Sequence, residues 1–221
     1  LEAIKEYKIP KLIIASTSEV YQYPKIIPTP EEIEMIVPDV LNPRYSYGGG
    51  KIATELLAIN YAKQYPINLK IFRPHNIYGP NMGNEHVIPE IILKILKASL
   101  KKDKKIKMQG DGTETRAFMH IADFVDAFNK IYQDDSKNII YNIGNCEEVS
   151  IEDIYKNLLN IANYSATLIS DSRPKGATIR RCPDNNKIIN LGYKQNVSLS
   201  EGLKETFKWY KTNIENKKNE K

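Results

Sequence analysis

The sequence predicts an α/β fold built on a doubly wound parallel sheet. Short apolar runs of strand length alternate along the chain with longer amphipathic stretches of helical period. Such alternation is typical of parallel sheets that are covered by helices. Polar clusters follow directly after two of the predicted strands, at 16–19 and 74–76. Because ligands bind at the carboxyl ends of strands in open α/β sheets, these clusters are candidate sites.

The first part of the chain has the order helix, strand, loop, helix, strand. The run Lys-Leu-Ile-Ile-Ala at 11–15 has the character of a buried parallel strand, and a helix over 1–8 precedes it. Prolines recur between 24 and 38 and predict a long irregular loop, of a length that is usually functional or disordered. A helix over 47–65 and a second buried strand over 69–73 follow.

The rest of the chain continues the alternation. Ser198 with Glu201 fits a capping box, Ser150 with Asp153 resembles a helix start, and Gly192 closes a short helix. After about residue 214 the chain is charged, and we expect it to fray. The expected helices are 87–98, 122–133, 150–164, 184–191 and 198–214, and the expected strands are 106–108 and 139–143.

The composition limits the binding partners and the cellular compartment that we expect for this protein. No apolar run approaches a membrane span and no signal peptide is visible, so we expect no membrane partner. Cys146 and Cys182 make no disulfide framework, which favours a reducing, cytoplasmic location. Much of the net charge of +5 comes from lysines in 101–107 and 217–221. No aromatic residues interleave them, so we interpret them as solvated surface and expect no nucleic-acid partner.

Tyr47 and Lys51 are the candidate catalytic pair. In a helix this spacing puts the phenol and the ammonium one turn apart on the same face. A nearby cation favours the phenolate form of a tyrosine, which can act as a base. The same spacing occurs at 7–11 and 21–25, but a proline inside each breaks the helical turn. Taken alone, the pair fits the start of an ordinary amphipathic helix equally well.

Two other patterns do not indicate sites. The histidines at 75, 86 and 120 have no metal-ligand spacing, so no metal is predicted. Gly110-x-Gly112 lacks a third glycine and opens no dinucleotide-binding helix, so we interpret it as a turn.

Several stretches in this order and spacing resemble the extended short-chain dehydrogenase/reductases, and more narrowly their NAD-dependent nucleotide-sugar epimerases and dehydratases. The stretches are Ala-Ser-Thr-Ser-Glu-Val-Tyr at 15–21, the pair at 47 and 51, Arg-Pro-His-Asn-Ile-Tyr-Gly-Pro at 73–80, Gly-Asp-Gly-Thr-x-Thr-Arg at 110–116, and Asp123.

The resemblance implies a Rossmann-type sheet with a smaller α/β substrate-binding domain. It places the C-terminal part of the NAD-binding domain at 1–80, with a return strand near 117–145, and mainly the nucleotide-sugar-binding domain at 81–221. It implies NAD as cofactor, a nucleotide sugar as substrate, and a homodimer whose four-helix interface includes the helix at 47–65. The family's N-terminal segment, with the Gly-x-x-Gly-x-x-Gly turn that holds the NAD pyrophosphate, has no counterpart in this sequence. We therefore expect a fragment that binds NAD poorly and is inactive alone.

The resemblance also assigns roles by position. Tyr47 would take the proton of the sugar C4 hydroxyl, Lys51 would hold the nicotinamide ribose, and Thr17 would hydrogen-bond the same sugar hydroxyl. The structural alternative for Thr17 is a turn cap, and for His75 a packed loop histidine. The residues that would contact the cofactor are Ser16, Tyr47, Lys51, Pro74 and His75.

The nucleotide would be held by a second set of residues. Val87 begins a helix, and a helix N-terminus is a ready anion site. The planar guanidinium group of arginine can donate two parallel hydrogen bonds, which suits the oxygen atoms of a diphosphate. The implied substrate-binding residues are Asn76, Val87, Arg116, Arg173 and Arg181.

The segment Thr17-Ser18-Glu19 leaves the reaction open. Within the family that this chain resembles, 4,6-dehydratases of the dTDP-glucose type usually have Thr-Asp-Glu there, with the aspartic acid protonating the leaving hydroxyl, so Ser18 counts against dehydration. The run at 15–21 is similar to UDP-glucuronate decarboxylases and some other dehydratases, whereas the run at 73–80 is more similar to epimerases. Glu19 is a catalytic candidate, with a structural role as the alternative. We expect an epimerase acting through a 4-keto sugar. Dehydration or decarboxylation is the enzymatic alternative, and non-catalytic nucleotide-sugar binding is the alternative of another class.

Overall fold

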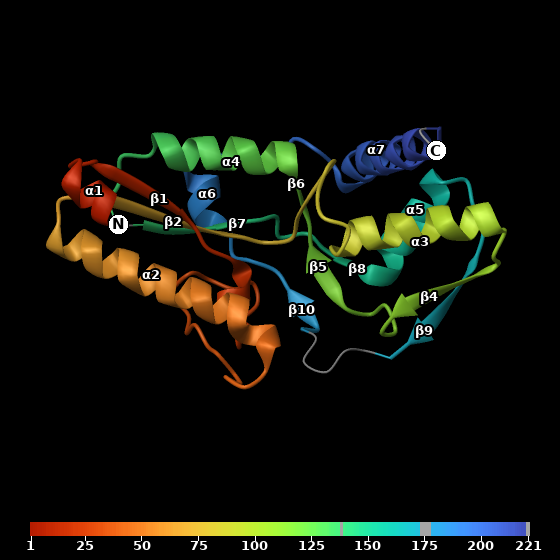
Figure 1. The fold of residues 1–221 in the computed structure, drawn as a ribbon, viewed down its shortest axis with the longest axis horizontal. Coiled ribbons are helices and arrows are strands. Elements are labelled where there is room, and N and C mark those ends of the chain that lie inside the picture. Colours follow the sequence, from red (N-terminus) through yellow and green to blue (C-terminus); the bar gives the residue numbers. More distant parts are fainter. Residues whose placement is uncertain (138, 173–177, 220–221) are drawn as a thin grey trace. The chain divides into compact units, whose positions relative to one another are not determined.

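The computed structural model describes the chain except residues 138, 173–177 and 220–221. The chain divides into two compact units (Figure 1). Unit 1 consists of Leu1–His75, Phe124–Cys146 and Arg181–Lys194. Unit 2 consists of Asn76–Asp123, Glu147–Arg180 and Gln195–Lys221.

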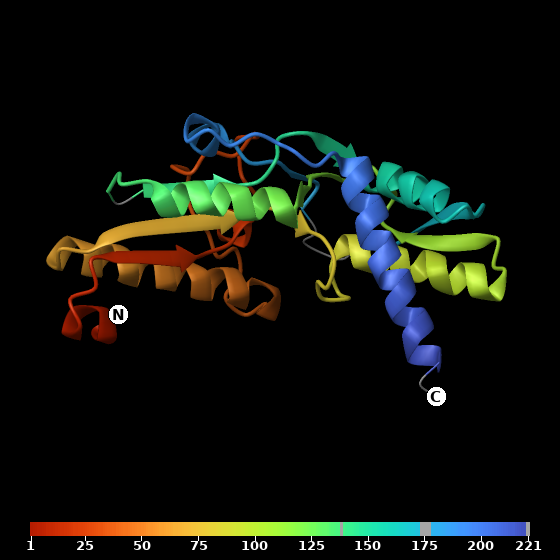
Figure 2. The same cartoon turned by 90° about the horizontal axis from the view of Figure 1, so that it is seen from above.

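Unit 1 is built on a parallel sheet of order β1-β2-β7. Its strands are β1 (Lys11–Ala15), β2 (Asn68–Pro74) and β7 (Ile139–Ile143). The register pairs Ala15 with Phe72, and Phe72 with Tyr141. Figure 2 shows β1 and β2 side by side. All three strands therefore end at the same edge of the sheet.

Two helices cover opposite faces of this sheet (Figure 1). Leu69 and Ile71 of β2 pack with Ala58 of α2 (Ser46–Gln64). Phe72, which points to the other face, contacts the rings of Phe124 and Phe128 in α4 (Ile121–Gln133). The side-chain alternation of a strand explains this division of β2 between two helices.

Short elements complete unit 1. They are α1 (Glu2–Glu6), the 3-10 turns η1 (Ser18–Val20) and η2 (Pro43–Tyr45), and α6 (Asn186–Asn190). Turn η2 leads directly into α2, and Asn42 caps it by accepting a hydrogen bond from the Arg44 amide at 3.0 Å.

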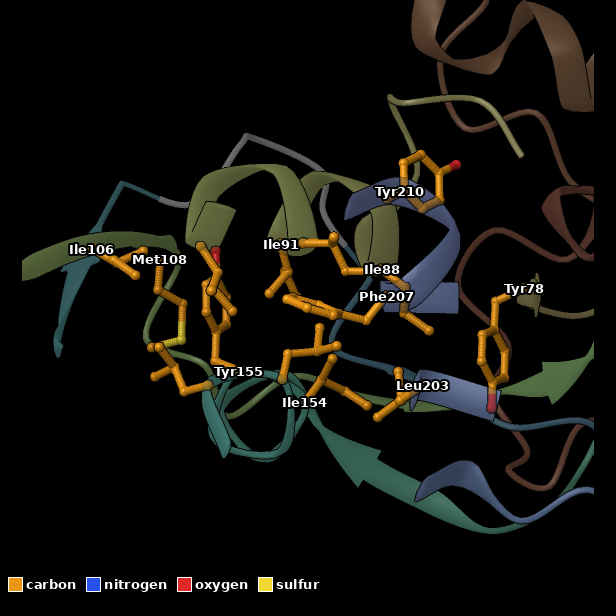
Figure 3. Close-up of a cluster of buried hydrophobic side chains, with 14 of the residues drawn as sticks. Tyr78, Ile88, Ile91, Ile106, Met108, Ile154, Tyr155, Leu203, Phe207 and Tyr210 are labelled. Carbon is orange, nitrogen blue, oxygen red and sulfur yellow. The ribbon is translucent and has the colours of Figure 1, made fainter. Parts of the chain in front are cut away.

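Unit 2 is organised around an apolar cluster between α3 (Val87–Lys101), α5 (Ile151–Ile161) and α7 (Leu199–Asn219). Helix α7 packs against both α3 and α5. Figure 3 shows side chains of the three helices directed toward one another. The labelled members of the cluster are Tyr78, Ile88, Ile91, Ile106, Met108, Ile154, Tyr155, Leu203, Phe207 and Tyr210.

Short strands make up the rest of unit 2. Strand β4 (Lys105–Gln109) pairs in parallel with β9 (Thr167–Asp171), and β3 (Ile77–Tyr78) with β6 (Met119–His120). Strand β5 (Thr115–Ala117) lies between β8 (Glu148–Ser150) and β10 (Arg180–Arg181).

The parallel sheet and its covering helices confirm the predicted α/β class. Strands β1 and β7 have the predicted bounds, and the capping box is present, because the Glu201 carboxylate accepts from the Ser198 amide at 3.1 Å. Helix α7 continues to Asn219, beyond the expected helix end at 214. Helix α1 is shorter than predicted, and strands β3, β5, β6 and β8–β10 were not predicted. In the part of the chain that the structure describes, no helix is long and apolar enough to cross a membrane.

Candidate active site

The carboxyl end of β1 runs directly into the turn η1. Thr17 caps this turn, because its Oγ1 accepts a hydrogen bond from the Glu19 amide at 3.2 Å. Ser16 and Thr17 are both buried. The Ser16 hydroxyl donates to the carboxylate of Glu55, so it is already engaged within the protein. The predicted polar cluster is therefore an ordered segment rather than a loose loop.

Helix α2 brings Tyr47 and Lys51 to the end of β1. Lys51 Nζ donates to the carbonyl oxygen of Ala15 at 2.8 Å and lies 6.0 Å from the centre of the Tyr47 ring. Tyr47 is 56% exposed, and no described residue hydrogen-bonds to its hydroxyl. The phenol is thus accessible and next to an anchored ammonium, as the helical spacing predicted.

Gly48 allows α2 to lie against η1. A Cβ atom at this position would stand 2.8 Å from the Glu19 carbonyl oxygen and 2.8 Å from the Gln22 amide nitrogen. Both distances are shorter than van der Waals contact, and the first involves backbone, which cannot swing away as a flexible side chain would. The glycine after Tyr47 therefore sets how closely the two candidate catalytic segments approach.

Glu19 and Arg181 form an ion pair. A guanidinium nitrogen of Arg181 donates to Glu19 Oε1 at 2.6 Å, and the two side chains are 16% and 30% exposed, respectively. Charge-assisted bonds of this length are among the stronger hydrogen bonds in proteins. Two residues that the resemblance assigned to different tasks, catalysis and diphosphate binding, are therefore direct neighbours.

His75 follows Pro74 at the end of β2 and is buried. Its Nε2 lies 3.1 Å from Asn142 Oδ1, and the Asn142 amide nitrogen donates to the Thr29 carbonyl, so Nε2 is the donor to Oδ1. His75 Nδ1 has no hydrogen-bond partner among the described residues. Burial lowers the pKa of His75 to about 3, and the imidazole is neutral at physiological pH. This environment fits the packed loop histidine.

The described part of unit 2 contains three predicted nucleotide-binding residues, Asn76, Val87 and Arg116. The Asn76 amide donates to the Ala117 carbonyl at 3.1 Å, and its backbone is left-handed, with φ of 44°. Val87 is the first residue of α3 and is 39% exposed. Arg173, a fourth candidate, lies outside the described residues.

Arg116 is engaged with the backbone of a neighbouring segment. Its guanidinium donates to the carbonyls of Thr178 and Ile179 at 2.6 and 3.0 Å. These bonds hold the side chain against the segment that leads into β10. Among the described residues, no group of three or more His, Cys, Asp or Glu side chains could hold a metal ion.

Sequence reasoning missed Glu55 and Arg73, which are buried behind the candidate catalytic residues. A signal was present, because positions 47, 51 and 55 share one helical face and Glu55 is a charged residue on the side that meets the sheet. On β2 the matching signal was Arg73, a charged residue directly after the apolar pair Ile71 and Phe72.

Comparisons with known proteins agree with this arrangement. A family model described as the NAD dependent epimerase/dehydratase family matches residues 1–144. The dTDP-D-glucose 4,6-dehydratase of Bos taurus is 31% identical, over 99% of this chain and 61% of its own length. This chain spans between 57% and 66% of the length of the first curated relatives that it matches.

Solved structures are similar over nearly the whole chain. The UDP-glucuronic acid 4-epimerase of Bacillus cereus, in complex with UDP-glucuronic acid and NAD, has a TM-score of 0.82 and 32% identity over 96% of this chain and 64% of its own. The UDP-glucose 4-epimerase of Thermotoga maritima, with UDP-glucose, has a TM-score of 0.83 and 26% identity over 96% of this chain and 67% of its own.

Proposed function

The chain belongs to the NAD-dependent epimerase/dehydratase family, and from this premise we propose that the whole protein is an NAD-dependent nucleotide-sugar epimerase acting through a 4-keto sugar. The observation that carries this choice of reaction is the hydrogen bond between Glu19 and Arg181. Glu19 Oε1 accepts this hydrogen bond from Arg181 at 2.6 Å, and the ion pair supports a structural role for Glu19. Ser18, which is buried, supplies no acid in its place.

Tyr47 is the proposed general base. Its exposed phenol would take the proton of the sugar C4 hydroxyl, and the Lys51 ammonium lies 6.0 Å from the centre of its ring. Thr17 is proposed to hydrogen-bond the same sugar hydroxyl. Because Thr17 Oγ1 already accepts from the Glu19 amide, its O–H remains the group that would donate to the substrate.

Residues at the ends of β1 and β2, with Lys51 of α2, are proposed to contact the nicotinamide end of NAD. When bound, NAD supplies the hydride acceptor for oxidation of the sugar carbon. An ammonium has three N–H donors, and Lys51 uses one of them on Ala15, which supports its proposed contact with a ribose hydroxyl. Ser16, Pro74 and His75 are proposed to face the same cofactor. Because the side chains of Ser16 and His75 are engaged by Glu55 and Asn142, these two would contact it through the backbone.

Nucleotide binding is proposed for the residues that the sequence resemblance named. We propose that the guanidinium groups of Arg116, Arg173 and Arg181 bind the diphosphate, and that Asn76 and the start of α3 at Val87 contact the nucleotide. The second candidate reaction is dehydration or decarboxylation after the same oxidation. It is favoured by the presence of Glu19 and by the 31% identity with a 4,6-dehydratase.

One experiment separates these reactions. The complete gene product is incubated with NAD and a panel of UDP-, GDP- and dTDP-linked hexoses and hexuronates, and the products are weighed by mass spectrometry and assigned by NMR. A product of unchanged mass and inverted C4 supports the epimerase. Loss of water or carbon dioxide contradicts it and places Glu19 in the chemistry. Binding of a nucleotide sugar without any product would favour the non-catalytic alternative.

The assembly is proposed to be a homodimer through α2. Leu56 and Leu57 of this helix are 51% and 59% exposed, so α2 presents apolar side chains that a second copy of the chain could cover. Sedimentation of the complete gene product at micromolar concentration should show a dimer, and Leu57→Glu should shift it toward monomer. A monomeric wild-type protein would contradict the assignment.

A further inference from the structure

A buried ion pair lies behind the candidate catalytic residues of unit 1. Glu55 of α2 and Arg73 of β2 are 0% and 1% exposed. Arg73 Nε donates to Glu55 Oε1 at 2.9 Å, and a terminal guanidinium nitrogen donates to Oε2 at 2.5 Å. A bidentate pair of this kind has a well-defined geometry in addition to its energy. It therefore sets both the distance and the orientation between α2 and β2.

The carboxylate of this pair also reaches β1. Glu55 accepts the hydroxyl of Ser16, the residue just before Thr17. One helical turn earlier, Lys51 Nζ donates to the carbonyl of Ala15 at 2.8 Å. Two successive turns of α2 are thus tied to two successive residues at the end of β1. Tyr47 lies one further turn along the same face of the helix.

The guanidinium of the pair reaches the far end of η1. Arg73 donates to the Tyr21 hydroxyl at 2.7 Å and to the Glu31 carbonyl at 2.9 Å. Its guanidinium carbon also stands 4.9 Å from the centre of the Tyr21 ring. The segment 16–21, which contains Thr17 and Glu19, is therefore held at both ends, by Glu55 at Ser16 and by Arg73 at Tyr21.

We propose that Glu55 and Arg73 are positioning residues that set the distance between the Tyr47–Lys51 face of α2 and Thr17. They act through Ser16 and Tyr21 and make no contact with substrate. The inference rests on the proposed function for its kinetic consequence, but the geometric part stands on the contacts alone. Replacing a buried ion pair by apolar residues is often neutral for stability, so geometry is the better reason for this pair.

A second buried ion pair on the same strand supplies the control. Lys70 of β2 has a fully buried side chain and pairs with Asp134, whose side chain is 9% exposed. Lys70 also donates to the Ser136 carbonyl. These partners follow α4, and the pair has no contact with Ser16, Thr17, Tyr47 or Lys51. Glu55→Gln and Asp134→Asn each remove the carboxylate charge that pairs with a buried cation of β2, while keeping the shape of the side chain.

The first experiment compares the steady-state kinetics of Glu55→Gln and Asp134→Asn in the complete gene product. We expect both to lower the Tm. Only Glu55→Gln should lower kcat, by about tenfold to a hundredfold, because small displacements of catalytic groups have effects of this size. KM for the nucleotide sugar should stay within about twofold, since Glu55 touches no substrate. If Glu55→Gln fails to fold, Glu55→Gln with Arg73→Gln leaves no unpaired buried charge and takes its place, with the same expected loss of kcat.

Hydrogen exchange on the same variants tests the positioning without any turnover. Faster exchange in 16–21 and in the first turns of α2 is expected for Glu55→Gln and not for Asp134→Asn. Unchanged exchange there, or a kcat equal to wild type below the Tm, would overturn the proposal. An inactive wild-type protein with the expected exchange pattern would instead refute the proposed function while supporting the positioning role.

Discussion

At the centre of unit 2, three helices bury an apolar cluster, whereas the sheet end of unit 1 buries an ion pair, a histidine and an asparagine. Figure 3 shows the first kind of interior, with Ile88, Ile154 and Leu203 directed toward one another. Apolar packing is non-directional and tolerates changes of shape when volume is kept. Buried polar groups need partners at defined distances and angles.

The difference shows where in this chain side chains must be held at defined distances and angles. The polar interior of unit 1 lies at the carboxyl ends of β1 and β2, next to the segment with Thr17 and Glu19 and to the start of α2. The proposed chemistry uses side chains from those elements only. Substitutions in the two interiors should therefore differ in kind, with lost activity in one and lost stability in the other.

The largest effect is expected at Tyr47. Tyr47→Phe should lower kcat by roughly 10²–10⁴-fold, because it removes the proposed base. Nucleotide-sugar binding, measured by calorimetry, should be nearly unchanged, since only one exposed hydroxyl is lost. Tyr7→Phe is the matched control, because Tyr7 also precedes a lysine by four residues and is 71% exposed. Equal kcat in Tyr47→Phe and wild type would remove Tyr47 from its role.

Substitutions in the apolar interior of unit 2 should lower the free energy of unfolding. Leu203 is 0% exposed within the cluster, and Leu203→Ala should cost about 2–5 kcal/mol of unfolding free energy through lost burial and a cavity. Leu100→Ala on α3, at a position 64% exposed, should change it by less than about 0.5 kcal/mol. Urea unfolding measures both. A cost for Leu203→Ala as small as that of the control would mean that unit 2 does not depend on this cluster.

A smaller difference in stability is expected between alanine substitutions at two glycines of α2, Gly48 and Gly50. Gly48→Ala places a Cβ 2.8 Å from the Glu19 backbone and should cost about 1–3 kcal/mol, with lower activity. Gly50→Ala meets no atom within 4 Å and should instead stabilise the helix by about 0.5–1 kcal/mol. Thermal unfolding of the two variants tests the close approach of α2 to η1. A stabilising Gly48→Ala would show that this approach is not required.

The smallest effect is a pH dependence in unit 1. Burial lowers the pKa of His75 to about 3, whereas an unfolded histidine has a pKa near ~6.5. As pH falls below about 6.5 the unfolded chain binds a proton that the folded chain does not, so stability is complete above that pH and decreases toward pH 3. Between pH 7 and 5.5 the loss from this residue is about 1 kcal/mol. In urea unfolding at the two pH values, His75→Gln should reduce the difference by that amount; an unchanged difference would contradict the burial argument.

Much of this outcome was predictable because its signals are local. The apolar runs at β1 and β7 have strand length and polar ends, and the capping box at Ser198 and Glu201 is read from four consecutive positions. Strand β5 was not predictable in the same way. Its three residues carry no period, and it exists because β8 pairs with it from far along the chain.

By itself the sequence determined the α/β class, the main helices of both units and the common face of Tyr47 and Lys51. Helical and strand periods convert spacing directly into a shared face, so no distant information is needed. Only the tertiary structure decided that Glu19 pairs with Arg181, 162 residues away, and that Glu55 pairs with Arg73 rather than with solvent. A charged residue in a sequence has many possible partners, and the order of strands in the sheet selects the one that is within reach.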